Sequence, residues 1–335
     1  MRTLKPAEAI EAAWDQATGG GRRRKRDRKK VKTDHMVTDE ILQHAGPDAV
    51  DLGAQSVFRP TFTGSRYERE WILNYLGRFY DDKQISDVLR RVKGGKEANV
   101  YCCEAHPDTG LDLIAAKVYR PRAFRQLRND SQYRQGRELL DERGKVVRDD
   151  GLLYAVRKKS TVGKEAEHTS WVEHEYQTLL KLWEAGADVP QPLSRGSSTI
   201  LMEYLGELDM PAQTLHSVTV PRAAAGPLFD QLLHNVELLL KLGLLHGDLS
   251  AFNVLYWDGA IKLIDFPQVV EARTNQDAYP IFRRDIARLC QYFVRYGLTA
   301  NPDQIASRLW QRHHLPLPED WSSLALEALP EEDEE

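Results

Sequence analysis

The stretch HGDLSAFNVLYWDGAIKLIDF, residues 246–266, places three polar side chains among apolar runs. Asp248 and Asn253 stand five residues apart in one polar loop, and Asp265 ends the apolar run that follows a short hairpin. Burying carboxylates together without a positive partner is costly, so a cation is expected to join them. Carboxylate and amide oxygens suit Mg²⁺, which also keeps water and phosphate oxygens as ligands. The stretch therefore predicts a loop and two strands that hold a metal ion and a nucleotide.

The chain has the composition of a folded protein with charged ends. Its 335 residues carry a formal net charge of −4 and are 41% hydrophobic, enough for one large domain or two medium ones. The three cysteines, of which Cys102 and Cys103 are adjacent, form no disulfide framework and favour a reducing compartment. Residues 1–20 contain no apolar signal segment, and no window approaches the roughly 18 apolar residues of a membrane span. We therefore expect a cytoplasmic protein without membrane contact.

Changes in composition and hydrophobic period divide the chain into five expected regions. They are a disordered basic arm (1–35), an N-terminal helical extension (36–91), a strand-rich lobe (92–205), a mainly helical lobe (206–313) and an acidic C-terminal tail (314–335). Within the strand-rich lobe, residues 121–169 form a polar insert that is too long for an ordinary loop and is expected to be partly helical or mobile. This order predicts an α+β fold, in which a small antiparallel sheet with one helix and a helical lobe enclose a cleft.

Two helix boundaries follow from local patterns. Apolar residues from Trp71 onward have helical spacing, and Asp81-Asp82 is expected to end that helix before a second short one. Ser170-Trp-Val-Glu173 matches a capping box, in which the serine and glutamate side chains bind free N–H groups of the first turn. The pattern predicts that a helix begins at Ser170 and that capping occupies Glu173.

Residues upstream of the opening stretch fit a nucleotide. Gly94 and Gly95 form a turn in which the missing side chains let backbone N–H groups approach phosphates, although most such turns join plain hairpins. Lys117 on a later strand is placed to bind the α- and β-phosphates with Glu175 of the capped helix as its partner, whereas a lone strand lysine is usually only solvated. The candidate nucleotide-binding residues around the turn are Gly94, Gly95, Lys96, Glu97, Ala98, Asn99 and Val100.

The end of another strand supplies the expected adenine contacts. Met202, Glu203, Tyr204 and Leu205 end the apolar run that begins at Thr199. We expect them between the lobes, where backbone amides would meet an adenine. The alternative for Met202 is a plain core position.

The spacing of Asp248, Asn253 and Asp265 is typical of protein kinases. In that arrangement Asp248 accepts the proton of the substrate hydroxyl, and Asn253 and Asp265 bind magnesium. The alternative is that Asp248 and Asn253 only make turn contacts and that Asp265 caps a neighbouring segment. Because the upstream nucleotide-binding residues and this stretch occur together, the catalytic interpretation is favoured.

The order of motifs along the chain resembles that of the RIO family of atypical protein kinases. The motifs are GKEANVY, IAAKVYR, WVEHEYQTLLKL, ILMEYLGE, HGDLSAFNVLY and LIDFPQ, and they lie between about Trp71 and Tyr296. GKEANVY and HGDLSAFNVLY are similar to the type 1 branch, whereas IDFPQ is similar to type 2. The resemblance implies a bilobal protein-kinase-like fold, ATP with Mg²⁺ or Mn²⁺, and serine/threonine kinase activity with autophosphorylation or slow ATP hydrolysis.

The resemblance also implies roles for single residues. Lys117 corresponds to the family's ATP-binding lysine, Asp248 to its catalytic aspartate, and Asn253 and Asp265 to its metal ligands. Asp265 also matches the aspartate that some RIO proteins are thought to phosphorylate transiently. In eukaryotes and archaea the family works on small ribosomal subunit maturation, which favours RNA or a ribosomal particle as the partner of the basic run GRRRKRDRKKVK at 21–32.

Departures from ordinary protein kinases carry further expectations. Gly247 stands where an arginine usually follows the histidine, so switching by a phosphorylated activation loop is not expected. Phe266-Pro267 replaces Phe-Gly, which limits flipping because proline fixes φ. Ser250, a candidate nucleotide contact, stands where many serine/threonine kinases have a lysine near the γ-phosphate, so Lys96 or an arginine of the insert is expected to supply that charge, or turnover is slow. Asp285 in RRDIARL is expected to brace the catalytic loop, with a surface charge as the alternative.

Two other classes of function fit parts of the sequence. HGDL, the later asparagine and IDF also occur in aminoglycoside and choline phosphotransferases, so a small-molecule kinase is the second hypothesis. GKEANVY and the insert at 121–169 favour the RIO resemblance over it. The third hypothesis is an ATP-gated binding module on RNA or a ribosomal particle. The protein substrate stays unknown.

Overall fold

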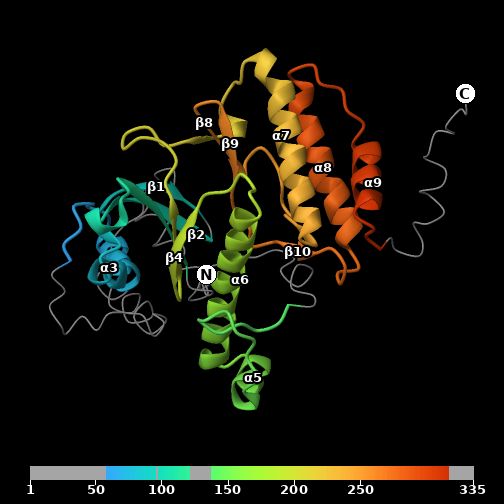
Figure 1. Ribbon diagram of the computed structural model, residues 1–335. Helices are drawn as coiled ribbons and strands as arrows, with labels where there is room; N and C mark the ends of the chain where they lie inside the picture. The colour runs from blue at the N-terminus through green and yellow to red at the C-terminus, as the bar shows by residue number, and fades with distance from the viewer. Residues whose placement is uncertain (1–57, 96, 121–136, 317–335) are drawn as a thin grey trace, which may run out of the picture. The chain divides into compact units, whose positions relative to one another are not determined.

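The chain forms two compact units in the residues that the computed structural model describes, which are 58–95, 97–120 and 137–316 (Figure 1). The first unit contains the described residues up to 120 together with 138–176 and 191–209, and the second contains Arg137, 177–190 and the residues from 210 onward. The predicted arm at 1–35, residues 121–136 of the insert and the tail from 317 onward lie outside the described residues. Within the described ranges, no helix is long and apolar enough to cross a membrane.

The first unit is built on a five-stranded antiparallel sheet. Its strands are β1 (Ile85–Gly94), β2 (Ala98–Ala105), β3 (Leu113–Tyr119), β4 (Pro192–Gly196) and β5 (Thr199–Glu203), with a 3-10 turn, η1 (Pro107–Thr109), between β2 and β3. They are hydrogen-bonded in the order β1-β2-β3-β5-β4. The second short helix predicted after Asp82 is wrong, because Ile85 and Val88 are strand residues with their side chains in the core. Strand β1 consequently crosses the predicted boundary between 91 and 92.

Helix α3 (Arg66–Asp81) contributes the apolar face that covers this sheet (Figure 1). Ser65 caps its first turn, since the serine hydroxyl accepts a hydrogen bond from the N–H of Glu68. Alternate residues of the strands face the helix, because successive side chains of a strand point to opposite faces. The shared core consists of Phe58, Trp71, Ile72, Tyr75, Leu76, Phe79, Ile85, Val88, Tyr101, Cys103, Ala105, Ile114, Ala116, Val118 and Leu201.

Helices α5 (Asp150–Arg157) and α6 (Thr161–Glu184) follow β3 in the chain. The N-cap of α6 is Ser160, whose hydroxyl accepts from the N–H of Gly163 at 3.2 Å. The prediction that this helix begins at Ser170 is therefore wrong. Ser170 lies inside the helix, and its hydroxyl accepts from the N–H of Leu140 at 2.9 Å. An earlier serine supplies the cap that the local pattern assigned to Ser170.

The second unit is mainly helical. Helices α7 (Arg222–Lys241), α8 (Ala278–Val294) and α9 (Pro302–Arg312) lie side by side in it (Figure 1). Its short elements are β6 (Gln213–Thr214), η3 (Leu215–Ser217), β7 (Leu244–Leu245), β8 (Val254–Trp257), β9 (Ala260–Leu263) and β10 (Val270–Glu271). Strands β8 and β9 form the hairpin expected between the polar loop and Asp265. A strand-rich unit followed by a mainly helical one matches the predicted α+β class.

Candidate active site

The predicted pair of Lys117 and Glu175 is formed. The Nζ of Lys117 on β3 lies 2.5 Å from the Oε1 of Glu175 on α6, and the two side chains are only 12% and 4% exposed. In the sheet register Val100 lies opposite Lys117, so the strand that follows the glycine turn runs beside this lysine. Lys117 is therefore a buried, paired cation next to the turn, and not a solvated strand residue.

Glu173, the competing partner on α6, is used elsewhere. Its carboxylate forms an ion pair with Arg195 of β4, although capping was expected to occupy it. The predicted capping role of Glu173 is wrong for the same reason as that of Ser170, since both lie inside the helix. The choice of Glu175 as the partner of Lys117 nevertheless holds.

The glycine turn joins β1 to β2. The N–H of Gly95 donates to the carbonyl oxygen of Ala98 at 3.0 Å, and a Cβ at Gly95 would lie only 2.9 Å from that oxygen. The carbonyl oxygen of Glu97 accepts from the N–H of Arg120, which ties the turn to the end of β3. Gly94 pairs with Asn99 at the end of the ladder, and Lys96 lies outside the described residues.

The side chain of Asn99 lies on the face of the sheet that α3 covers. Its Nδ2 donates to the hydroxyl of Tyr101 at 3.1 Å, and that hydroxyl donates to Oε1 of Glu68 at 3.0 Å. Arg91 forms an ion pair with the same carboxylate oxygen at 3.1 Å. Lys117 faces the opposite side, because Ala116 and Val118 next to it are in the core under α3. The Asn99 side chain therefore makes a buried structural contact, and a nucleotide contact of Asn99 through its backbone stays a prediction.

Burial strongly raises the pKa of Tyr101, and the charge of Glu68 raises it further. The folded chain therefore keeps this proton at a pH where an unfolded tyrosine, with a pKa of about 10, releases it. The stability that the Tyr101 hydroxyl contributes is complete below pH ~10 and decreases as the pH rises above that value.

Tyr101→Phe is expected to lower the free energy of unfolding by about 1–3 kcal/mol at neutral pH, because Asn99 loses its acceptor. It should also flatten the decrease in stability above pH ~10. Urea unfolding at several pH values measures both effects. Tyr256→Phe is the control, because the hydroxyl of this β8 tyrosine makes no hydrogen bond in the described part of the chain. An alkaline decrease that is unchanged in Tyr101→Phe would contradict the assignment.

The residues expected to contact adenine lie at and after the end of β5. Met202 pairs with Ala115 and is half-buried, so it is not a plain core residue, and Leu205 is half-buried as well. Glu203 is bound to Gln191 through its N–H at 2.8 Å and its carboxylate at 3.1 Å.

A cavity of about 490 Å³ in the first unit lies against Glu203 and Tyr204. The Tyr204 hydroxyl accepts from Arg90 at 2.8 Å and donates to the carbonyl oxygen of Glu207 at 3.1 Å. Leu111, Leu113 and Leu208 are among the residues that complete the lining of this cavity. None of its lining residues belongs to the glycine turn or to Lys117, so this cavity does not unite the predicted nucleotide contacts.

The polar loop of the second unit brings Asp248 and Asn253 together. The Nδ2 of Asn253 donates to the backbone oxygen of Asp248 at 2.9 Å and lies 3.3 Å from its Oδ2. The N–H of Asn253 donates to the carbonyl oxygen of Ser250, whose half-buried side chain makes no polar contact within the described ranges. Asn253 is buried and its amide group is oriented, so its Oδ1 is the atom left to bind a cation.

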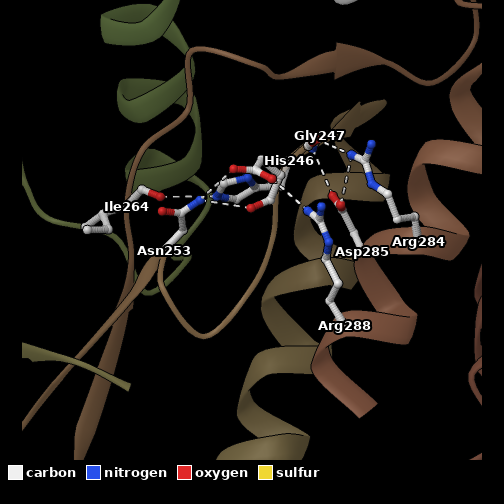
Figure 2. Close-up of polar contacts among 8 residues, drawn as sticks. His246, Gly247, Asn253, Ile264, Arg284, Asp285 and Arg288 are labelled. Atoms are coloured by element: carbon white, nitrogen blue, oxygen red, sulfur yellow. Dashed lines mark hydrogen bonds and ion pairs between the residues drawn. The ribbon is translucent and has the colours of Figure 1, made fainter. Parts of the chain in front are cut away.

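Asp265 follows a segment that is held on both sides (Figure 2). The N–H of Ile264 donates to the carbonyl oxygen of Asn253 at 3.0 Å, and the carbonyl oxygen of Ile264 lies 3.2 Å from Nε2 of His246. Asp265 itself has a left-handed backbone with φ of 73°, which costs a non-glycine residue of order 1–2 kcal/mol. The carboxylate of Asp265 and the oriented amide oxygen of Asn253 fit a hard cation such as Mg²⁺, which needs few protein ligands beside phosphates. Among the described residues no cluster of three or more His, Cys, Asp and Glu side chains could hold a metal ion.

The expected brace of the catalytic loop is present. The N–H of Gly247 donates to Oδ2 of Asp285 at 3.0 Å, and Arg284 donates to the carbonyl oxygen of Gly247 (Figure 2). Asp285 is 3% exposed, and burial raises its pKa while the charge of His246 opposes that rise. Gly247 has φ of +83°, and a Cβ there would lie 2.1 Å from the carbonyl oxygen of Gln268. Glycine is therefore required where other kinases have arginine.

Two arginines of α8 were missed by the reasoning from sequence. Arg284 holds Gly247, and Arg288 lies with Nη1 2.6 Å from Oδ1 of Asp248. Residues four apart lie on the same face of a helix, so the spacing in RRDIARL was the available signal. Arg137, an arginine of the insert, donates to the carbonyl oxygens of Pro267 and Val269, directly after Asp265.

A family model described as "RIO domain" matches residues 99–305 of the chain. A relative named serine/threonine-protein kinase RIO1 from Chaetomium thermophilum is 28% identical over 86% of this chain and 56% of its own length. The RIO-type serine/threonine-protein kinase Rio1 of Haloferax volcanii is 29% identical over 68% of this chain and 70% of its own length. Human serine/threonine-protein kinase RIO1 is 32% identical over 64% of this chain and 34% of its own length. The chain thus spans about half of the fungal relative and about a third of the human one.

Proposed function

The chain belongs to the RIO domain family, and from this premise we propose that it is an ATP-dependent serine/threonine protein kinase that phosphorylates itself or slowly hydrolyses ATP. The observation that carries the proposal is the buried ion pair of Lys117 and Glu175, with a distance of 2.5 Å. In protein kinases this pair must be in place for the lysine to bind the nucleotide phosphates. The names of the relatives support the same activity.

The proposed reaction uses Asp248 as the base. The hydroxyl oxygen of a serine or threonine forms a bond to the γ-phosphorus of ATP, and the bond from that phosphorus to the bridging oxygen breaks. ADP leaves with the electron pair of the broken bond, and the hydroxyl proton passes to Asp248. Lys117 binds the α- and β-phosphates, and the strand that follows the glycine turn runs beside it. Asn253 and Asp265 would hold Mg²⁺ or Mn²⁺, which would neutralise phosphate charge when bound.

Asp265→Ala is expected to weaken metal-dependent ATP binding about tenfold more than Asn253→Ala does, which corresponds to ~1.4 kcal/mol. Asp265 supplies a full negative charge to the cation, whereas Asn253 supplies a neutral carbonyl oxygen. Titration of each variant with ATP at fixed Mg²⁺ measures the difference. Equal losses, or a larger loss in Asn253→Ala, would count against the assignment of the two ligands.

Incubation of the chain with ATP labelled on the γ-phosphate tests the proposed activity. We expect label on serine or threonine of the chain without any added acceptor, and none in Asp248→Asn. Strong stimulation by an amino sugar or by choline would instead favour a small-molecule kinase. Tight RNA binding with single-turnover hydrolysis would favour an ATP-gated binding module.

The partner of the basic run at 21–32 also belongs to the proposal. Nine of these twelve residues are lysine or arginine, which favours contact with the phosphates of RNA or a ribosomal particle. The run lies outside the described residues, and this partner stays a prediction. RNA binding across a salt series, with and without residues 1–32, tests it.

A further inference from the structure

Arg288 of α8, labelled in Figure 2, contacts the proposed catalytic base Asp248. Its Nη1 is 2.6 Å from Oδ1 of Asp248, and the two side chains are 39% and 42% exposed. This is the one polar contact that Arg288 makes within the described part of the chain. Since a guanidinium carries five N–H donors in a plane, most of its donors are left over after this contact.

The polar loop itself supplies no positive charge. Residues 246–253, HGDLSAFN, contain the carboxylate of Asp248 and no lysine or arginine, and Ser250 stands where many serine/threonine kinases have a lysine. A γ-phosphate that approaches Asp248 would place a second anion next to the first, and this repulsion is strong where water is partly excluded. Arg288 is a cation in the same unit as Asp248 and already in contact with it.

Lys96 and the arginines of the insert were the expected sources of this charge. Lys96 lies outside the described residues. Arg137 donates to the carbonyl oxygens of Pro267 and Val269, so its guanidinium is engaged with the backbone. Arg288 needs no rearrangement of the loop to act next to Asp248, because its position is already set by that contact.

We propose that Arg288 is a phosphate-binding residue, which holds Asp248 with one N–H and binds the transferred phosphoryl group with the others. The inference rests on the proposed kinase function. As the hydroxyl oxygen bonds to the γ-phosphorus and the bond to ADP breaks, charge spreads over the equatorial oxygens of the phosphoryl group. Donors that are already oriented toward this charge lower the barrier without reorganisation. Arg288 stays protonated throughout, and the proton of the hydroxyl goes to Asp248.

A purely structural role of Arg288 predicts different results. A half-exposed ion pair contributes only about 0–1 kcal/mol, so its loss would leave the fold intact and at most loosen Asp248. Such loosening would slow transfer, but it would not change the preference of the site for ATP over ADP. ADP lacks the γ-phosphate, and the ratio of the two affinities therefore reports a phosphate contact without any need for turnover.

The experiment compares Arg288→Gln, Arg288→Lys and the double variant Arg288→Gln with Ser250→Lys. We expect Arg288→Gln to lower the transfer rate about 10²-fold and the ATP-to-ADP affinity ratio about tenfold. Arg288→Lys should retain part of the transfer rate and part of the affinity ratio. In the double variant, Ser250→Lys should raise the rate at least about tenfold over Arg288→Gln by supplying the charge from within the loop. Arg283→Gln is the matched control, because this neighbour on α8 pairs with Asp303 at 2.5 Å, and it should behave as the unchanged chain.

Each other outcome overturns one proposal and not both. Transfer by Arg288→Gln at the original rate, or an unchanged ATP-to-ADP ratio, overturns the phosphate-binding role. A slow Arg288→Gln that Ser250→Lys fails to restore overturns it as well, in favour of a role limited to positioning Asp248. If the unchanged chain transfers no phosphate from ATP in the same assay, the proposed function fails, and the affinity ratio still decides the role of Arg288.

Discussion

Asp248→Asn is expected to lower the rate of phosphoryl transfer about 10²–10⁴-fold and to leave the affinity for ATP within about threefold. The amide has nearly the same shape as the carboxylate, and its oxygen can still accept from Arg288, which lies 2.6 Å from Oδ1 of Asp248. It cannot take up the hydroxyl proton of the acceptor. The substitution therefore removes the base and keeps the loop, because Asn253 also holds the backbone oxygen at this position.

Single-turnover transfer with γ-labelled ATP measures the rate, and equilibrium titration measures the affinity. Asp230→Asn is the matched control, since this aspartate is exposed on α7 and makes no polar contact in the described ranges. Its transfer rate and urea midpoint should equal those of the unchanged chain. Transfer by Asp248→Asn at a rate near the original would remove Asp248 from the role of base.

The parts of the site that could be predicted are those whose partners either are close in the sequence or lie on regular elements. Asp248 and Asn253 are five residues apart in one loop, so any tight loop brings them together. Lys117 and Glu175 are far apart in sequence, but each occupies a regular element, and only one face of each element points toward the other. The ion pair could therefore be predicted from the two elements, once the strand and the helix had been identified.

The contacts that could not be predicted have partners that the local sequence does not specify. Ser170 has the sequence of a cap, but Ser160 offers the same hydroxyl earlier, and the helix begins at the first cap available. Asn99 lies in the glycine-turn motif, yet Tyr101 and Glu68 draw its side chain to the opposite face of the sheet. Glu68 is on the helix of the N-terminal extension, and nothing near Asn99 in the sequence points to it.

The contact of Arg288 with Asp248 could not be predicted from the local sequence either. The spacing in RRDIARL predicts that Arg284 and Arg288 share one face of a helix, but not which loop that face meets. That choice is made by the buried hydrogen bond between Asp285 and the N–H of Gly247, which brings α8 against the loop. The role of Asp285 was expected. The roles of Arg284 and Arg288 follow from it once the packing of α8 against the loop is known.

Gly247→Ala is expected to lower the free energy of unfolding by roughly 2–4 kcal/mol and the transfer rate more than about 10²-fold. The left-handed backbone at φ +83° costs an alanine about 1–2 kcal/mol by itself. The new Cβ would also lie 2.1 Å from the carbonyl oxygen of Gln268, a backbone atom that no side-chain rotation can remove. Relief requires the loop to move, and movement breaks the hydrogen bonds of Gly247 with Asp285 and Arg284.

Gly243→Ala is the control that separates the effect of the steric clash from the effect of the left-handed backbone. Gly243 has φ of +71°, but its Cβ would meet no atom within 4 Å, so only the left-handed cost of about 1–2 kcal/mol applies. Urea unfolding of both variants gives the difference in stability, and single-turnover transfer gives the difference in rate. We expect Gly243→Ala to transfer phosphate at the original rate, because it lies before the loop and touches none of the site. Equal losses of stability in the two variants would contradict the clash of the Gly247 Cβ with the carbonyl oxygen of Gln268 at 2.1 Å. Preserved transfer in Gly247→Ala would mean that the hydrogen bonds from α8 to Gly247 do not position Asp248.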